Sequence, residues 1–306
     1  MTTASPTDRK TLRIGHSPDP DDAFMWWPLA NFTAPDGQRL TPRIDTGRYD
    51  FEHVLEDIQS LNVRSEQGEL EITAISIHQY PFVADQYALT SCGSSMGDNY
   101  GPMIVAKPNT MKCPGCLKGK KLAIPGERTT AWLTTQIMLA EHGLTKDDIN
   151  WSFVMFDEIL PRVASGEFDA GLIIHEGQIT FQNQGLALLI DLGAWWTESR
   201  GLPLPLGGNC IRRDLVRSGE AGAICRILLD SIKHALAHRE DAVAFALNYA
   251  RDMESELADR FVGMYVNDWT LDYGPRGREA VNQLLKEGAD AGIVPAVGEV
   301  DFVEPA

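Results

Sequence analysis

Residues 168–177 read FDAGLIIHEG and join an apolar strand pattern to a histidine and a glutamate. The run at 170–174 predicts a buried strand, which ends abruptly at His175 and Glu176. In open α/β sheets, ligands bind in the crevice beyond the carboxyl ends of the strands. Histidine is also the side chain best suited to proton transfer near neutral pH. The stretch therefore predicts an α/β fold with a candidate proton-transfer residue, although a histidine that only ends a core strand is the alternative.

The bulk composition is that of an ordinary soluble globular protein. The chain has 306 residues, of which 43% are hydrophobic and 23% charged. Its length suits two domains of about 150 residues or one larger domain. The formal net charge is −16, so the basic surface that nucleic-acid-binding proteins need is missing. Anionic membrane surfaces are disfavoured for the same reason. We therefore expect a small-molecule ligand, with no nucleic-acid and no membrane partner.

The cysteines and the N-terminal segment both indicate the cytoplasm. Five cysteines are an odd number, and their scattered spacing fits a reducing compartment rather than a disulfide framework. Residues 1–10 are polar and lack the apolar core of a secretory signal, and no run of about 18 apolar residues could span a membrane. Cys113 and Cys116 have metal-ligand spacing, but no second pair completes a metal site. A surface turn is expected there, with a metal or redox role as the alternative.

Short apolar runs alternate with longer helical patterns along most of the chain, which favours βαβ units and largely parallel sheets. Strands are expected at 11–15, 71–77, 102–106, 121–124, 151–156, 170–174 and 186–192. Helices are expected from Pro20 and at 58–67, 129–142, 158–165, 221–238, 241–252, 254–265 and 276–287. Residues 93–101 and 193–208 are expected to be irregular, and the residues after Gly298 a frayed tail.

Two crossings of the chain, near residues 104–108 and 205–211, bracket a middle block and suggest that one domain is inserted into another. The first, discontinuous domain would comprise residues 1–105 and 208–306. The second would comprise residues 106–207. The cleft between two such domains is a favoured place for a small ligand.

Three histidines, His16, His78 and His175, follow predicted strands. Two would lie on the first domain and one on the second. All three are expected to face the shared cleft, because ligand sites form beyond the carboxyl ends of strands. The other four histidines lie in helical or surface contexts and are expected to face solvent: His53, His142, His234 and His238.

Two helix starts flank the expected cleft. In the second domain, residues 125–131 join a strand to a helix that Thr129 or Thr130 can cap. Helix N-termini of this kind hold carboxylates, phosphates or hydroxyls, and a plain N-cap is the alternative. In the first domain, Asp19 can cap a helix that begins at Pro20, and two further acidic residues already occupy its positive end. The start of the first-domain helix is therefore expected to bind a hydroxyl or a cation in preference to an anion.

Motifs for cofactors and metals are absent from the sequence. The glycines at 93, 97 and 101 lack the strand-turn-helix context of a nucleotide fingerprint. No serine nucleophile elbow, Walker loop, zinc-protease pair or paired metal cluster occurs. The expected mechanism therefore uses neither a metal nor an organic cofactor.

Motifs spread over nearly the whole chain resemble those of one family: Ser17-Pro18-x-Pro20-x-Asp22-x-Phe24, Glu56-Asp57-Ile58-x-x-Leu61-Asn62, residues 101–106, 125–131 and 170–176, and Asp191-Leu192-Gly193-Ala194-Trp195-Trp196 with the residues 201–207 that follow. On these residues, the chain resembles 1,4-dihydroxy-6-naphthoate synthase, a family of the futalosine route to menaquinone. The resemblance implies the two-domain fold of type 2 periplasmic binding proteins. In that fold, mostly parallel sheets are flanked by helices, and the ligand binds in the interdomain cleft.

The resemblance also implies an activity and a site. The family converts cyclic dehypoxanthine futalosine to 1,4-dihydroxy-6-naphthoate and releases the sugar-derived part without a metal or organic cofactor. His175 would be the general base that starts this fragmentation. Substrate contacts would come from a first-domain strand end and from the second-domain helix start: Thr73, Ala74, Ile75, Ser76, Thr129, Thr130 and Ala131. The other candidate binding residues are Ser17, Asp22, His16 and His78.

The chain departs from the family pattern at four positions. Asp19 and Asp21 stand where many members have Cys and Asn, Ala23 replaces a common Thr, and Ala74 replaces a common Lys. These changes add negative charge near the pocket and remove a cation, which disfavours a carboxylate substrate bound in the usual way. Two alternatives stay open. One is a paralogue acting on another small carboxylate or nucleoside-derived molecule, with chorismate dehydratase as a sister activity, and the other is a solute-binding protein without catalysis.

Overall fold

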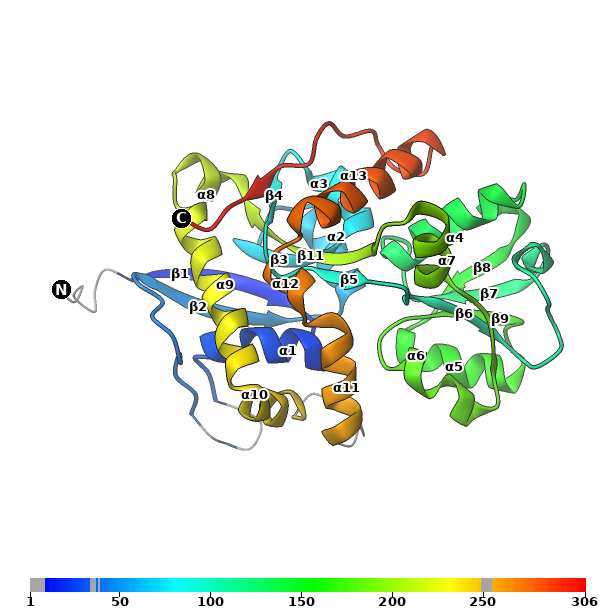
Figure 1. The fold of residues 1–306 in the computed structure, drawn as a ribbon, viewed down its shortest axis with the longest axis horizontal. Helices are drawn as coiled ribbons and strands as arrows, with labels where there is room; N and C mark the ends of the chain where they lie inside the picture. Colours follow the sequence, from blue (N-terminus) through cyan, green and yellow to red (C-terminus); the bar gives the residue numbers. More distant parts are fainter. Residues whose placement is uncertain (1–8, 34–36, 38, 249–254) are drawn as a thin grey trace.

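Two lobes, each built around its own β-sheet, make up the structure (Figure 1). The computed structural model describes residues 9–33, 37, 39–248 and 255–306. The first lobe contains a seven-stranded sheet to which the first and last strands belong, and the second lobe contains a five-stranded sheet. The predicted α/β class, with mostly parallel strands flanked by helices, is confirmed.

The sheet of the first lobe has the strand order β12-β4-β11-β3-β1-β2, and β5 pairs with β11 beside this path. Strand β1 is parallel to β2 and β3, β4 is parallel to β12, and β11 is antiparallel to β3, β4 and β5. The strands are β1 Lys10–His16, β2 Tyr49–Leu55, β3 Ile72–Ser76, β4 Tyr87–Thr90, β5 Ser95–Gly97, β11 Leu204–Arg212 and β12 Phe302–Val303.

The sheet of the second lobe has the strand order β10-β6-β9-β7-β8. Strand β7 is parallel to β8 and β9, and β6 is antiparallel to β9 and β10. The strands are β6 Met103–Ala106, β7 Lys121–Ile124, β8 Asn150–Phe153, β9 Ala170–Ile173 and β10 Ala187–Asp191. The strands that run against their neighbours, β6 and β11, are each the first strand after the chain passes from one lobe to the other (Figure 1).

Helices cover both faces of the first-lobe sheet and leave a separate apolar core on each side. One core contains residues of α1, α9 and α10, and the other contains residues of α3 and α13. The described helices are α1 Pro20–Trp26, α2 Ile58–Ser65, α3 Tyr80–Val83, α4 Thr130–Glu141, α5 Phe156–Ser165, α6 Gly177–Thr180, α7 Leu192–Arg200, α8 Arg213–Arg217, α9 Ala221–Ala237, α10 Arg239–Ala246, α11 Ser255–Tyr265, α12 Asp268–Leu271 and α13 Gly274–Asp290. Short 3-10 turns lie at Trp27–Leu29, Ile77–Gln79, Pro114–Leu117, Lys146–Asp148 and Phe181–Gln184.

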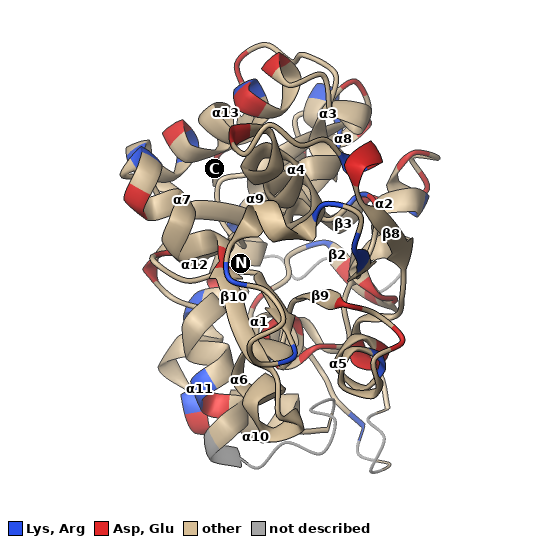
Figure 2. Cartoon of the chain, turned by 90° about the vertical axis from the view of Figure 1, so that its right-hand side faces the viewer, with Lys and Arg blue, Asp and Glu red and all other residues tan. Residues whose placement is uncertain are grey.

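Basic and acidic residues are both present on the side of the second lobe. Figure 2 shows Lys and Arg positions interspersed with Asp and Glu positions along the ribbon on that side. No helix in the described part of the chain is both long and apolar enough to cross a membrane.

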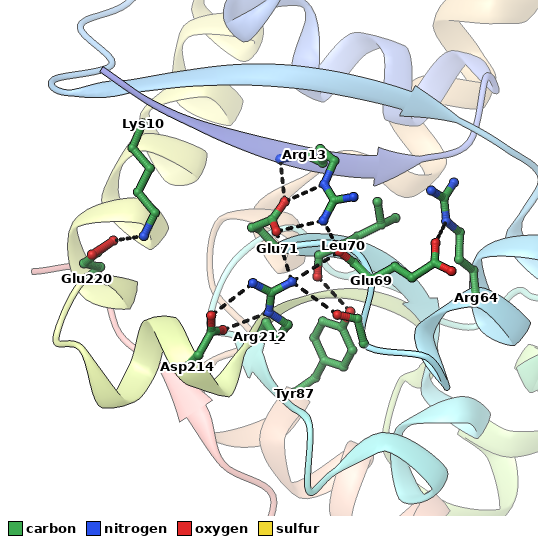
Figure 3. A network of polar contacts seen from close by, with 11 residues as sticks. Lys10, Arg13, Arg64, Glu69, Leu70, Glu71, Tyr87, Arg212, Asp214 and Glu220 are labelled. Carbon is green, nitrogen blue, oxygen red and sulfur yellow. Dashed lines mark hydrogen bonds and ion pairs between the residues drawn. The ribbon is translucent and has the colours of Figure 1, made fainter. Parts of the chain in front are cut away.

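An ion-pair network centred on Glu71 ties β11 to β3 and β1 (Figure 3). Arg13 of β1 donates from Nε to Oε2 of Glu71 at 2.9 Å, and Arg212 of β11 donates from Nη1 to Oε1 at 3.0 Å. Burial opposes ionisation of this carboxyl, but the hydrogen bonds from Arg13 outweigh it and lower the pKa of Glu71 to about 2. The network therefore fixes the strand on which the chain returns from the second lobe.

Residues 193–208 were expected to be irregular, and this expectation was wrong. They form most of α7 and the first part of β11. The side chain of Asp191 caps α7 by accepting hydrogen bonds from the backbone N–H groups of Gly193 and Ala194. Gly201 ends the helix with a φ of 69°. The tryptophan and glycine content of this segment concealed an ordinary capped helix.

Three further differences concern strands. Residues 93–101 contain the short strand β5, and the expected tail forms β12, whose backbone pairs with β4. Strand β2 was not predicted, and it pairs with the whole of β1. The helices expected at 241–252 and 254–265 correspond to α10 and α11, with residues 249–254 outside the described part of the chain.

Replacing Glu71 with Gln is expected to lower the free energy of unfolding at pH 7 by roughly 1–3 kcal/mol, because both arginines lose their charged acceptor. The pKa of Glu71 is depressed in the folded state, so this stabilisation is present above pH 4.5 and is lost as pH falls toward 2. Urea unfolding at several pH values measures it, with the exposed Glu52→Gln as the control. A difference from wild type that does not shrink on acidification would contradict the account.

Candidate active site

A cavity of about 120 Å³, open to solvent, lies between the lobes, where β3 and β9 end. Most of the candidate residues line it: Ser17, Asp22, Ala74, Ile75, Ser76, Thr129, Thr130, Ala131 and His175. The structure therefore brings residues from both lobes to one cavity.

His175 lies just beyond β9, in the turn that leads to α6. Its backbone has a φ of 53°, in the left-handed region that residues other than glycine seldom adopt. The backbone carbonyl of His175 accepts a hydrogen bond from the N–H of Gln178 at 3.2 Å. The imidazole packs edge-on against Phe156 with ring centroids 4.9 Å apart, and its side chain is 17% exposed. Backbone strain of this kind concentrates at functional sites.

Asp19 reaches the same imidazole from the other lobe. Its Oδ2 lies 3.5 Å from Nε2 of His175 and accepts a hydrogen bond from the hydroxyl of Ser17 at 2.6 Å. The helix α1 begins at Pro20 as predicted, but the Asp19 side chain makes no capping hydrogen bond, because it turns toward Ser17 and His175 instead. The residue is 6% exposed, so its carboxylate contacts the histidine from within the protein.

Two more carboxyl groups of α1 line the cavity, and both are perturbed. Burial and the neighbouring charge of Asp19 raise the pKa of Asp21 to about 6, with the charge of His175 opposing the shift. Burial and the charge of Asp21 raise the pKa of Asp22 well above its usual range. Asp22 also accepts a hydrogen bond from the N–H of Ser17 at 2.7 Å. The first-lobe wall of the cavity can therefore hold a proton close to neutral pH.

No Lys or Arg lines the cavity among the described residues. Ala74 is one of the lining residues. His175 is the one side chain of this lining that can carry positive charge. A carboxylate ligand would therefore be bound by backbone N–H groups, by uncharged hydroxyl and amide side chains or by His175.

The opposite wall is the start of α4. Thr129 is the N-cap, as predicted, and its hydroxyl accepts a hydrogen bond from the N–H of Trp132. The hydroxyl of Thr130 donates to the carbonyl of Leu206 at 2.6 Å and accepts from the N–H of His78 at 3.2 Å. The Thr130 hydroxyl is therefore already hydrogen bonded within the protein. The groups that the start of α4 can offer to a ligand are its free backbone N–H groups.

His78 joins the lobes and does not line the cavity. Its Nδ1 donates to the carbonyl of Thr129 at 2.9 Å, and burial lowers its pKa to about 4. The neutral ring is thus a link between the first lobe and the α4 N-terminus.

His16 does not line the cavity either. Its Nδ1 donates to the carbonyl of Ser17 at 2.8 Å, and its Nε2 lies 2.9 Å from Nδ1 of His53. Burial lowers the pKa of His16 to about 3 and that of His53 to about 4. The expectation that His53 faces solvent was wrong, because β2 places it beside β1 and against the ring of Phe32.

Thr73 is fully buried and donates its hydroxyl to the carbonyl of Ala74, so it also lies behind the cavity wall. Sequence reasoning missed Gln178 and Tyr265, which line the cavity. The hydroxyl of Tyr265 is hydrogen bonded to the side-chain amide of Gln178 at 2.8 Å, which joins α11 to α6. The sole sequence signal was that Gln178 closely follows His175.

Residues 12–290 match the protein family described as menaquinone biosynthesis. The chain belongs to this family. It is 36% identical over 284 residues to a 1,4-dihydroxy-6-naphthoate synthase of Thermus thermophilus, which covers 93% of this chain and 96% of that protein. A Streptomyces coelicolor protein with the same name is 35% identical over 292 residues, or 94% of this chain and 96% of that one. Like these relatives, the chain is an enzyme of menaquinone biosynthesis.

Solved structures share the fold of the chain. A crystal structure of an Archaeoglobus fulgidus protein aligns with a TM-score of 0.79 and 38% identity, covering 93% of this chain and 98% of that one. The alkanesulfonate-binding protein SsuA of Xanthomonas axonopodis aligns with a TM-score of 0.68 at 13% identity, covering 97% and 98%. The second likeness concerns the fold alone, and it confirms the expected periplasmic-binding-protein fold.

Replacing Asp21 with Asn is expected to stabilise the protein at pH 8 by about 1–2 kcal/mol, because it removes a buried charge. The folded-state pKa is raised, so the cost of this carboxylate is present above pH 6 and disappears as pH falls from about 6 toward 3.8. Thermal unfolding from pH 8 to pH 4 should show the gain shrinking across that window. The exposed Asp85→Asn is the control, and a variant less stable than wild type at pH 8 would contradict the account.

Proposed function

We propose that the protein is a cofactor-independent lyase that converts cyclic dehypoxanthine futalosine to 1,4-dihydroxy-6-naphthoate. The observation that carries the proposal is the pairing of His175 with Asp19 at the interlobe cavity. Two relatives that carry the name of this synthase support it, at 36% and 35% identity over nearly the full chain.

In the proposed reaction, His175 accepts a proton from the bound substrate, and fragmentation then releases the sugar-derived part. A positioned imidazole acting as general base contributes roughly 10²–10⁴-fold to such a step. The imidazolium that forms is stabilised by the carboxylate of Asp19, 3.5 Å from Nε2. Asp21, whose charge interacts with that of His175, adds to this stabilisation when it is ionised.

Asp19 is a positioning residue in this scheme. It is absent from the described cavity lining, and the Ser17 hydroxyl holds its carboxylate at 2.6 Å. It therefore acts through His175 by fixing the ring and favouring its charged form. This role is available because an aspartate stands where many relatives have a cysteine.

The polarity of the cavity suggests how the substrate lies in it. Its carboxylate would bind the backbone N–H groups of Thr130 and Ala131, which begin α4 and have no partner within the helix. Its hydroxyl groups would donate to the carboxyl groups of Asp21 and Asp22 on the opposite wall. This orientation needs no lysine at position 74, and it keeps the substrate carboxylate away from the acidic wall.

The domain division also belongs to the proposal, with residues 1–105 and 208–306 in one domain and residues 106–207 in the other. It is supported by the change of sheet between β5 and β6 and again between β10 and β11. Because β6 begins at Met103 and β11 at Leu204, each boundary falls inside the strand that follows the change of sheet. The cytoplasm is the proposed compartment, because all five cysteines are free thiols.

Incubation with cyclic dehypoxanthine futalosine should yield the naphthoate product, detected by mass spectrometry. His175→Ala should lower kcat by about 10²–10⁴-fold, because the base is removed, whereas the exposed His142→Ala should not change it. Ligand binding without turnover by either protein would favour a solute-binding function. Absence of both binding and turnover would favour a paralogue with a different substrate.

Asp19→Asn should lower kcat by about tenfold or more, less than loss of the base itself, because the imidazolium loses its charged neighbour. KM should change little, since Asp19 acts through His175. Steady-state kinetics separates the two parameters, with the exposed Asp147→Asn as the control. A rise in KM at unchanged kcat would show instead that Asp19 binds substrate.

A further inference from the structure

Cys113 and Cys116 form a close pair of thiols in a loop of the second lobe. Cys113 is exposed, Cys116 is half-buried, and their sulfur atoms are 2.8 Å apart. The other three cysteines of the chain are buried. The loop contributes no residue to the described lining of the interlobe cavity, so the proposed lyase reaction leaves this pair unexplained.

The backbone between the two cysteines brings the thiols together. Residues Pro114–Leu117 form a 3-10 turn, and the N–H of Cys116 donates to the carbonyl of Cys113 at 3.0 Å. A disulfide bond is about 2.05 Å long. The two sulfur atoms therefore need to approach by less than about 1 Å to become bonded, which is a side-chain movement.

The two thiols are chemically different. With Cys113 as the donor of the hydrogen bond that the two sulfur atoms share, the pKa of Cys116 is lowered and that of Cys113 raised, and backbone hydrogen bonds lower the pKa of Cys116 further. The thiolate is the attacking form in thiol–disulfide exchange, so Cys116 is the nucleophile and Cys113 the resolving thiol. Both are accessible from solvent, as such a reaction requires.

Lysines are concentrated in the sequence around the pair. Residues 107–121 contain five lysines and no Asp or Glu, while the whole chain has a formal net charge of −16. Two of these lysines pair with carboxylates outside the loop, Lys118 with Asp148 and Lys120 with Asp169. The charge of Lys112 favours the thiolate of Cys116. A local basic patch of this kind draws anionic reagents toward it.

The structure favours a redox role for these thiols over a metal-binding role. Structural zinc sites need four ligands, and no group of three or more His, Cys, Asp or Glu residues suited to a metal occurs in the described part of the chain. Redox chemistry needs the two thiols alone.

We propose that Cys113 and Cys116 are a redox-active dithiol that exchanges with an anionic low-molecular-weight disulfide of the oxidised-glutathione type. The thiolate of Cys116 attacks one sulfur of that disulfide, whose S–S bond breaks and releases one thiolate. Cys113 then loses its proton to solvent and attacks the Cys116 sulfur of the mixed disulfide, which releases the second thiolate. The protein loses two electrons and two protons, and the small disulfide becomes two thiols.

Oxidised glutathione added to the reduced native protein tests this. Two of the five thiols should be lost, the intact mass should fall by two hydrogens, and peptide mapping should place the bond between Cys113 and Cys116. Cys113→Ser should instead retain one glutathione on Cys116, whereas Cys116→Ser should take up glutathione on Cys113 more slowly, and neither variant should form the internal disulfide. Lys112→Glu should slow the reaction several-fold at low salt and less at high salt.

Lyase activity and circular dichroism should match wild type in all these variants, which separates failure of this proposal from failure of the proposed function. Wild type that loses thiols no faster than the Cys113→Ser/Cys116→Ser double variant would overturn the proposal. So would stoichiometric zinc retained by the pair that blocks the exchange.

Discussion

The contact between Asp19 and His175 is the interaction on which the site depends, because the two residues come from different lobes. Asp19 follows β1 and is fixed by Ser17, whereas His175 follows β9 and is fixed by its left-handed turn. The carboxylate reaches the imidazole only if the lobes are arranged as they are. Two further hydrogen bonds between the lobes hold that arrangement. His78 bonds to the carbonyl of Thr129 at the start of α4, and Tyr265 bonds to the side chain of Gln178 in α6.

This geometry gives the cavity two walls that differ in charge. One wall is the acidic start of α1, where burial and mutual repulsion raise the pKa values of Asp21 and Asp22. The other is the N-terminus of α4, where backbone N–H groups favour an anion. The two walls therefore differ in charge, and this difference would orient an asymmetric substrate between them.

Much of this could be predicted from the sequence, where short-range patterns decide the structure. The strand before His175, the cap at Thr129 and the crossings between lobes all follow from local periodicity and capping. The ring directions of His16 and His78 could not be predicted, because the end of a strand does not determine which neighbour a side chain meets. His16 contacts His53 on strand β2, which was not predicted. The Asp19 side chain does not cap α1 and instead contacts His175, more than 150 residues away in sequence.

A crystal structure of the His175→Ala variant with cyclic dehypoxanthine futalosine bound is the most direct test of the account. The substrate is expected to lie in the interlobe cavity, with its carboxylate at the N–H groups of Thr130 and Ala131 and its reacting carbon facing the space left by the imidazole. His16 and His78 are expected to make no contact with the substrate. A substrate whose carboxylate instead points toward Asp21, or that binds outside this cavity, would contradict it.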